Sequence, residues 1–175
     1  MRPRVGISAC LLGQAVRYDG GHKHDALLTD TLGRVVEWVP VCPEVELGLG
    51  VPREAIRLEG DAASPHLVGL QSRHDHTAAM ARLAHARVDD LVRQDVVGYV
   101  FKQDSPSCGM ERVLVHGTTG PPLRSGVGLF ARVLMERLPL LPIAEEEQLH
   151  DPARRERFLE RLFAYARSSE AVRAH

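Results

Sequence analysis

The sequence has few cysteines, few aromatic residues and no long apolar run. Cysteine accounts for three of the 175 residues, and aromatic residues make up 5%. A small, odd number of cysteines argues against a disulfide framework and leaves buried thiols or metal ligands as the alternatives. No run of eighteen or more apolar residues occurs and no basic leader precedes an apolar segment. These absences argue against a membrane-spanning helix and a secretory signal.

Neither sign of charge dominates the sequence. Lys and Arg number 22 against 23 Asp and Glu, for a formal net charge of -1, so no general positive field would hold nucleic acid. Hydrophobic residues at 44% and charged residues at 26% are typical of a globular protein. We expect one cytoplasmic domain over residues 1–175 that binds a small molecule, with no membrane association and no strong nucleic-acid binding. The sequence does not indicate an oligomeric state.

Short β-rich runs alternate with helical patterns along the chain. Strands are predicted at residues 5–9, 35–41, 96–101, 113–115 and 140–143. Helices are predicted at residues 25–32, 75–92, about 129–137 and about 151–168, with a frayed tail beyond Arg167. Residues 55–69 are interpreted as an irregular connection. This alternation predicts an α/β fold, a single domain with a mostly parallel, Rossmann-like sheet and helices on both faces.

Each cysteine follows a predicted strand. Cys10 comes after the first strand, Cys42 after the second, and Cys108 lies in the loop after the strand at residues 96–101. Because the carboxyl ends of parallel strands meet at one edge of a sheet, we expect the three thiols to converge there. Three inert core thiols are the plain alternative, since free cysteine is often buried.

Convergent thiols would suit two kinds of metal centre. One is a structural zinc completed by a histidine, with His22 or His24 as the candidate, and the other is a 4Fe-4S cluster with one open iron. Zinc ribbons and knuckles draw ligands from C-x-x-C pairs, which this sequence lacks, so the pattern favours the cluster. The nine histidines form no H-x-x-x-H or H-E-x-x-H motif, and none is assigned to a metal.

Three long segments resemble a known family. They are C-L-L-G-Q-A-V-R-Y-D-G-G at residues 10–21, V-P-V-C-P-E-V-E-L-G-L-G-V-P-R at residues 39–53 and F-K-Q-D-S-P-S-C-G at residues 101–109. Asp75, Thr77 and Gly126-Val127-Gly128 match lesser motifs of the same family. In this order, over about residues 1–142, the segments resemble the thiouracil desulfidase (TudS-like) family, formerly a domain of unknown function.

The resemblance implies a cytoplasmic, non-redox desulfidase. It implies a 4Fe-4S cluster held by Cys10, Cys42 and Cys108, whose open iron accepts sulfur from thiolated uracil or its nucleotides, such as 4-thiouridine monophosphate. Water would then replace the sulfur. Two other classes remain as alternatives: a non-catalytic iron-sulfur electron-transfer module, which usually has a fourth cysteine ligand, and a zinc-binding module.

Polar residues beside the cysteines are candidates for catalysis. Glu44 lies two residues after Cys42 and could activate water or move a proton to the substrate ring, or it could be a surface or capping residue. The resemblance favours Ser105 as catalytic. Ser107 lies between Ser105 and Cys108 and could orient substrate, although S-P-S is equally typical of a turn.

Cationic and aromatic residues in the motifs are candidates for binding substrate. Arg17 and Arg53 carry guanidinium groups suited to a phosphate, or they could form structural salt bridges. Lys102 could neutralise a carboxylate, the cluster or a substrate oxygen, or it could end its strand in water. Tyr18 and Asp19 are expected to shape the same loop as Arg17.

The Gly126-Val127-Gly128 turn precedes a predicted helix. Its backbone N–H groups could approach a phosphate, or Gly126 and Gly128 could serve only tight packing.

Overall fold

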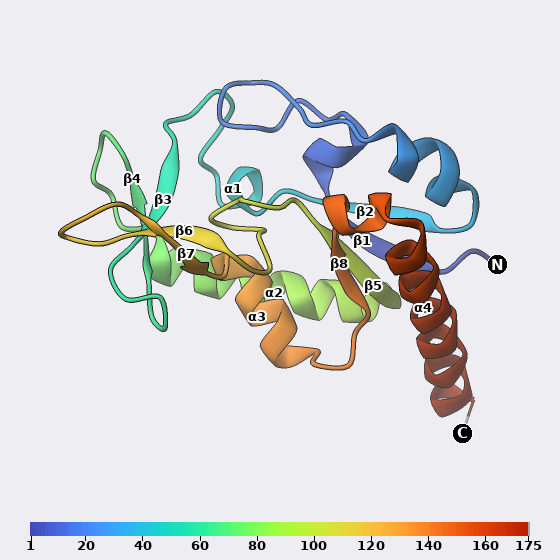
Figure 1. Ribbon diagram of the computed structural model, residues 1–175. Helices are drawn as coiled ribbons and strands as arrows, with labels where there is room; N and C mark the ends of the chain where they lie inside the picture. The colour runs from blue at the N-terminus through green and yellow to red at the C-terminus, as the bar shows by residue number, and fades with distance from the viewer. Residues whose placement is uncertain (175) are drawn as a thin grey trace.

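Four parallel strands form sheet A of the computed structural model, which describes residues 1–174 (Figure 1). Their order across the sheet is β2-β1-β5-β8. The bounds are Arg4–Ser8 for β1, Glu37–Val41 for β2, Val96–Phe101 for β5 and Ile143–Glu145 for β8. β1 pairs in parallel with β2 and β5, and β5 pairs in parallel with β8. The predicted α/β fold with a mostly parallel sheet is therefore confirmed.

A second, mixed sheet lies beside sheet A and was not predicted. Sheet B has the order β4-β3-β6-β7. Its strands are β3 Ile56–Glu59, β4 His66–Gly69, β6 Val113–His116 and β7 Leu123–Gly126. β3 is parallel to β6, whereas the other two pairs are antiparallel. The interpretation of residues 55–69 as irregular is wrong, because Ile56 and Leu58 of β3 are buried alternately with more exposed neighbours and pair with β4.

Four α-helices accompany the sheets within residues 1–174. They are α1 Pro43–Glu46, α2 Thr77–Arg93, α3 Leu129–Arg137 and α4 Pro152–Arg173. Asp151 begins α4 as predicted, since its carboxylate accepts the backbone N–H of Ala153 at 2.9 Å. The helix then continues to Arg173, so the prediction of a frayed tail beyond Arg167 is wrong.

Two predicted elements differ in the structure, one in type and one in position. The segment at residues 25–32 forms a π-helical turn, Leu27–Thr31, followed by a 3-10 turn, Leu32–Arg34, so Gly33 lies within a turn and does not end a helix. The last strand begins at Ile143, where it was expected to end. Leu140 is exposed in the preceding turn, because its apolar side chain points away from the sheet's core.

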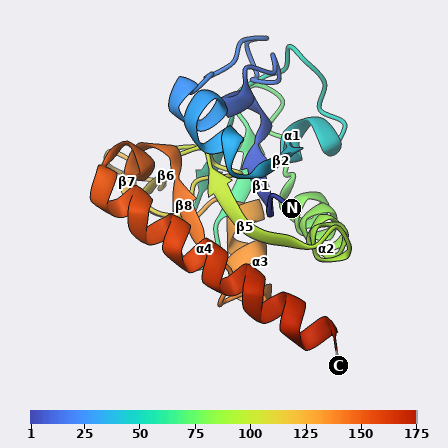
Figure 2. The same ribbon diagram turned by 90° about the vertical axis from the view of Figure 1, so that its right-hand side faces the viewer.

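Helices cover both faces of sheet A (Figure 2). α4 packs on one face, where Phe158 and Leu162 join an apolar cluster with residues of β1 and β5. α2 and α3 lie on the other face, in a second cluster that includes Tyr99 and Phe101. α4 approaches β5 so closely that a Cβ on Gly98 would lie 2.4 Å from Leu162 Cδ1. The α4 position thus depends on a glycine in the central strand.

The carboxyl edge of sheet A collects the segments that carry chemistry. β1, β2 and β5 are neighbours in the sheet, and each leads directly into a segment that contains one cysteine. β8 adds Glu145 at the same edge, where it pairs with Phe101 of β5. Across residues 1–174, none of the helices is long and apolar enough to traverse a lipid bilayer.

Candidate active site

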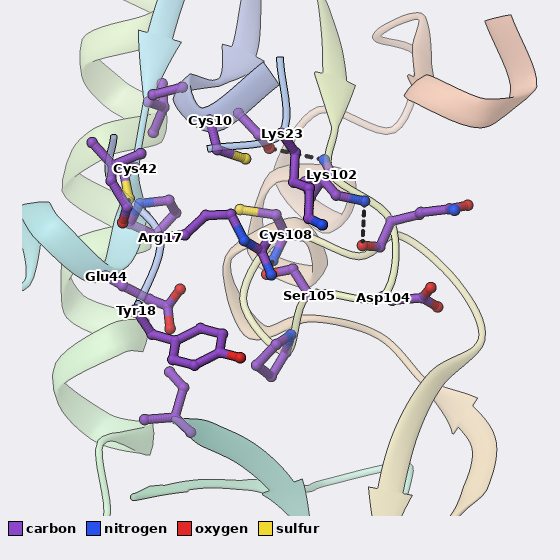
Figure 3. Close-up of a pocket in the computed structure, with 18 of the residues that line it drawn as sticks. Cys10, Arg17, Tyr18, Lys23, Cys42, Glu44, Lys102, Asp104, Ser105 and Cys108 are labelled. Atoms are coloured by element: carbon purple, nitrogen blue, oxygen red, sulfur yellow. Dashed lines mark hydrogen bonds between the residues drawn. The ribbon is translucent and has the colours of Figure 1, made fainter. Parts of the chain in front are cut away.

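The three cysteines line one cavity of about 440 Å³ at the carboxyl edge of sheet A. In Figure 3 the sulfur atoms of Cys10, Cys42 and Cys108 face the same space, with Glu44 and Tyr18 on one side of it. The other residues that line the cavity include Ser8, Arg17, Lys23, Arg53, Lys102, Gln103, Asp104 and Ser105. The predicted convergence of the three thiols is therefore observed.

Cys10 is held in a tight turn that follows β1. The 3-10 turn Ala9–Leu12 ends at Gly13, whose φ of 87° is in the left-handed region that favours glycine. The Cys10 carbonyl accepts the backbone N–H of Gly13 at 3.2 Å and that of Lys23 at 3.0 Å. The second bond brings Lys23 to the cavity beside Cys10.

Cys42 caps the short helix α1 at the end of β2. Cys42 is the N-cap residue of this helix, and its thiol lies 3.9 Å from the Val16 carbonyl oxygen. Pro43 stands at the first helical position, where it needs no N–H partner. The C-P-E sequence thus fixes the thiol and directs Glu44 into the same cavity.

Cys108 lies in a loop that is held by hydrogen bonds within the loop and from α3. Ser105 Oγ accepts the backbone N–H of Ser107 at 3.2 Å and of Cys108 at 3.0 Å, and the Ser105 carbonyl accepts that of Gly109 at 2.8 Å. The first amides of α3 donate to the loop, from Leu129 to Pro106 O and from Phe130 to Ser107 O. The loop conformation therefore depends on both its own side chains and α3.

Burial dominates the protonation of the thiols in the protein alone. It raises the pKa of the Cys10 thiol, with the positive charges of Arg17 and Lys102 opposing the shift. It likewise raises the pKa of Cys42, and it raises the pKa of Cys108 far above its usual range, with a hydrogen bond from Ser8 opposing. Thiols of this kind are neutral until a metal replaces their protons, because a coordinating thiol is deprotonated.

Glu44 and Arg53 form a buried ion pair at the cavity wall. Arg53 Nη2 lies 3.3 Å from Glu44 Oε2, and the same guanidinium donates to Val16 O and Gly50 O, both at 2.9 Å. Burial raises the pKa of Glu44, while the charge and hydrogen bond of Arg53 oppose the shift. Of the two roles considered for Arg53, the structure shows the salt bridge.

Lys102 also has a carboxylate partner. Its Nζ forms an ion pair with Glu146 and donates to the Gln103 carbonyl at 3.2 Å. Glu146 is 4% exposed, so the ammonium compensates a buried negative charge. Of the roles considered for Lys102, neutralising a carboxylate is the one observed.

Arg17 and Tyr18 reach the cavity, whereas Asp19 does not line it. The Arg17 guanidinium lies 5.9 Å from the centre of the Tyr18 ring. Asp19 is exposed and accepts the backbone N–H of Gly21 at 2.9 Å, which stabilises the turn of this loop. The expectation that Tyr18 and Asp19 shape the loop agrees with these contacts.

Ser107, Gly126 and Gly128 are not among the residues that line the cavity. Ser107 is fully buried. The N–H of Gly128 donates to Gly109 O at 2.7 Å, and a Cβ on Gly128 would lie 2.5 Å from the Ser107 carbonyl carbon. Gly128 thus allows α3 to pack tightly against the Cys108 loop, whereas Gly126 allows β7 to pack against Val113 and Val115 of β6.

Ser8, Lys23, Glu145 and Glu146 belong to the site but were not identified from the sequence. Ser8 Oγ accepts the Lys102 backbone N–H at 2.9 Å, and both glutamates bind the Cys108 loop. Only their positions in the sequence could have indicated them. Ser8 lies two residues before Cys10 at the end of a strand, and Glu145 and Glu146 follow the last apolar run. Their partners are remote in sequence, so the pattern alone could not pair them.

The donor set suits a cluster better than one ion. Within residues 1–174, no three His, Cys, Asp or Glu side chains are grouped as ligands of a single metal ion. Three thiols with no fourth cysteine in this chain fit a cluster with one iron that lacks a cysteine ligand.

Comparisons with known proteins agree with this site. The family model described as 2-thiouracil desulfurase matches residues 5–146, a range that includes all three cysteines. A solved structure titled "[4Fe-4S]-dependent thiouracil desulfidase TudS" is 32% identical, with a TM-score of 0.71, over 87% of this chain and 96% of that one. Comparison with curated sequences finds no match. With its cysteine-lined cavity inside the matched range, the chain belongs to the 2-thiouracil desulfurase family.

Proposed function

We propose that this protein replaces sulfur by oxygen on thiolated uracil or its nucleotides, using a 4Fe-4S cluster held by Cys10, Cys42 and Cys108. The observation that carries the proposal is the meeting of three thiols, the Glu44 carboxylate and the Ser105 hydroxyl at a single cavity. Its volume of about 440 Å³ is within the range of small-molecule sites. When bound, the cluster would supply a soft Lewis-acidic iron with affinity for thiocarbonyl sulfur.

Glu44 is the proton carrier in this proposal. Water attacks the thiocarbonyl carbon, a carbon-oxygen bond forms, the carbon-sulfur bond breaks, and sulfur leaves as hydrosulfide. The two protons of the water go to Glu44 and the hydrosulfide or to solvent, and no electron is gained or lost. Glu44 suits the task because burial raises its pKa above the usual range of a carboxyl, and Arg53 fixes its orientation.

Ser105 is the candidate for orienting the substrate. Its oxygen already accepts two backbone N–H groups, so its own proton is the group left to donate. A hydroxyl held in this way can donate to a substrate oxygen or to the charge that develops as water adds. The two amides fix the position of the oxygen before substrate arrives.

Arg17 and Lys23 favour an anionic substrate. Both line the cavity, and neither side chain forms an ion pair within residues 1–174. Arg53 and Lys102, in contrast, are neutralised by Glu44 and Glu146. Two uncompensated cations suit the phosphate of a thiolated nucleotide such as 4-thiouridine monophosphate.

Anaerobic reconstitution tests the proposed function. Protein loaded with iron and sulfide should take up about four irons per chain, and each of Cys10→Ser, Cys42→Ser and Cys108→Ser should lower that content. With 4-thiouridine monophosphate or 2-thiouracil, the loaded protein should release sulfide and oxo product in equal amounts without added reductant. Water labelled with heavy oxygen should label the product.

The Glu44→Gln variant tests the role of Glu44 in the reaction separately from binding of the cluster. It should keep the iron content and lower the rate about 10²- to 10⁴-fold. A loaded wild-type protein that yields neither sulfide nor oxo product from either substrate would overturn the proposed function.

A further inference from the structure

Two consecutive buried carboxylates follow the last strand of sheet A. Glu145 ends β8 and is 5% exposed, and Glu146 begins the next 3-10 turn. Acidic residues are rarely buried without partners, so the contacts of this pair are informative. Both face the loop that carries Ser105 and Cys108.

Glu146 holds the first end of that loop. One carboxylate oxygen pairs with Lys102 Nζ, and the other accepts the backbone N–H of Gln103 at 2.8 Å. The Lys102 backbone N–H donates in turn to Ser8 Oγ at 2.9 Å. The main chain of Lys102 is thus fixed from the end of β1, and its side chain from the 3-10 turn that follows β8.

Glu145 holds the other end of the loop. Its Oε1 accepts the backbone N–H of Met110 at 2.9 Å and that of Glu111 at 3.4 Å. No cation pairs with Glu145 in the part of the chain that the structure describes, and burial raises the pKa of this carboxyl. Both glutamates therefore accept backbone N–H groups of the loop, but of the two only Glu146 pairs with an ammonium.

We propose that Glu146 is a positioning residue of the active site, which fixes the Lys102 ammonium at the cavity wall and the start of the Cys108 loop. This inference rests on the proposed function. Lys102 lines the cavity on a flexible four-carbon stem, and the ion pair with Glu146 removes that freedom. The negative charge of Glu146 also cancels the positive charge of Lys102. The pair therefore adds no net charge near the thiols.

Glu146→Gln and its neighbour Glu145→Gln form a matched test on the full-length, cluster-loaded protein. Each variant keeps an amide oxygen to accept the loop N–H, but only Glu146→Gln leaves Lys102 uncompensated. We expect Glu146→Gln to raise the cluster's reduction potential, because net charge near a cluster sets that potential, and to lower kcat about 10- to 100-fold with little change in KM. Glu145→Gln should shift both quantities less.

A double variant separates charge from loss of structure. Lys102→Met with Glu146→Gln removes one charge of each sign, so its potential should return toward the wild-type value although its activity stays low. Glu146→Asp, which keeps the charge on a shorter stem, should keep the potential and lower kcat. If Glu146→Gln does not fold, these two variants still decide the question through the same measurements.

Two results would overturn the inference. One is a loaded Glu146→Gln variant whose potential and kcat equal those of Glu145→Gln and the wild type. The other is a double variant whose potential differs from the wild type as much as that of Glu146→Gln. An inactive but fully loaded wild-type protein would instead count against the proposed function, since the potentials would still report the Glu146 and Lys102 pair.

Discussion

Arg53 Nη2 lies 3.3 Å from Glu44 Oε2, and only 4% of the Arg53 side chain is exposed. The guanidinium also donates to the carbonyls of Val16 and Gly50, so one side chain joins the Arg17 loop, the turn before Arg53 and the Glu44 carboxylate. This relationship gives Arg53 a structural role that depends on its charge.

Arg53→Leu should therefore destabilise the protein strongly. It would leave the Glu44 carboxylate buried without its partner, which costs on the order of 3–5 kcal/mol. Arg57→Leu is the control, because the Arg57 side chain is 37% exposed in its pair with Glu59 and its loss should cost under about 1 kcal/mol. Chemical unfolding of both variants under reducing conditions measures the difference, and equal losses would contradict the assigned role.

Arg17→Gln should affect nucleotide substrates selectively. If Arg17 binds the phosphate, its loss should raise KM for 4-thiouridine monophosphate about 10- to 100-fold, from a charged hydrogen bond of about 1.5–3 kcal/mol. KM for 2-thiouracil, which has no phosphate, should change little. Steady-state kinetics on both substrates checks this. Equal increases for both would exclude phosphate binding as the role of Arg17.

The carboxyl edge of sheet A could be predicted at β1, β2 and β5 because each of these strands leads into a segment that contains a cysteine. The β-rich runs that lead to Cys10, Cys42 and the Cys108 loop are short, and parallel strands bring their ends together. In sheet B, the strand predicted at residues 113–115 is present as β6, but the other three strands gave no such signal. β7 is L-R-S-G, with three of its four residues exposed, and β3 and β4 are separated by a Gly- and Pro-containing turn, so only pairing with neighbours makes them strands.

Partners within the site were the least predictable part. The sequence identified Lys102 and Arg53 as cations near the cysteines, but whether each is free or neutralised depends on carboxylates from other elements. Glu146 lies 43 residues beyond Gln103, whose backbone N–H it accepts. Local pattern cannot pair such residues, because their proximity arises from the parallel pairing of β5 with β8.

Ser105→Ala and Ser107→Ala should behave differently although the two serines are near neighbours. Ser105 Oγ accepts two loop amides, so its loss leaves them unpaired, costs about 1–3 kcal/mol and lowers kcat. Ser107 Oγ is buried and has no hydrogen-bond partner among residues 1–174, so its removal should cost under about 1 kcal/mol and preserve activity. Unfolding and kinetics measure both. A Ser107→Ala variant as impaired as Ser105→Ala would show that this hydroxyl acts in the reaction.

Gly128→Ala should disturb the Cys108 loop. The new Cβ would lie 2.5 Å from Ser107 C and 2.8 Å from Cys108 N, so the backbone must shift, at a cost of about 1–3 kcal/mol, and iron uptake should fall. Gly117→Ala is the control, since its Cβ would be 3.7 Å from the nearest atom, Thr119 O. Iron content after reconstitution compares the two. Full loading of Gly128→Ala would mean that the loop accommodates the methyl group.

His150 and Asp25 connect the turn before α4 to the segment after Cys10. His150 Nε2 lies 2.7 Å from Asp25 Oδ2, and this hydrogen bond raises the pKa of His150 above its ordinary value of 6.5. Because the folded protein binds this proton more tightly than the unfolded chain, the contribution to stability is complete below the unfolded pKa and is lost as pH rises through the folded pKa. It should be under about 1 kcal/mol, because His150 is half exposed.

His150→Gln tests this pH dependence. Its stability deficit relative to the wild type should be present at about pH 5.5 and disappear by about pH 8.5, on either side of the histidine titration. Denaturant unfolding at the two pH values measures the deficit, and NMR titration of the His150 ring measures the pKa directly. Asp25→Asn should return that pKa toward 6.5. The same deficit at both pH values would mean that His150 stabilises the junction through packing, since only the protonated ring gains from the carboxylate of Asp25.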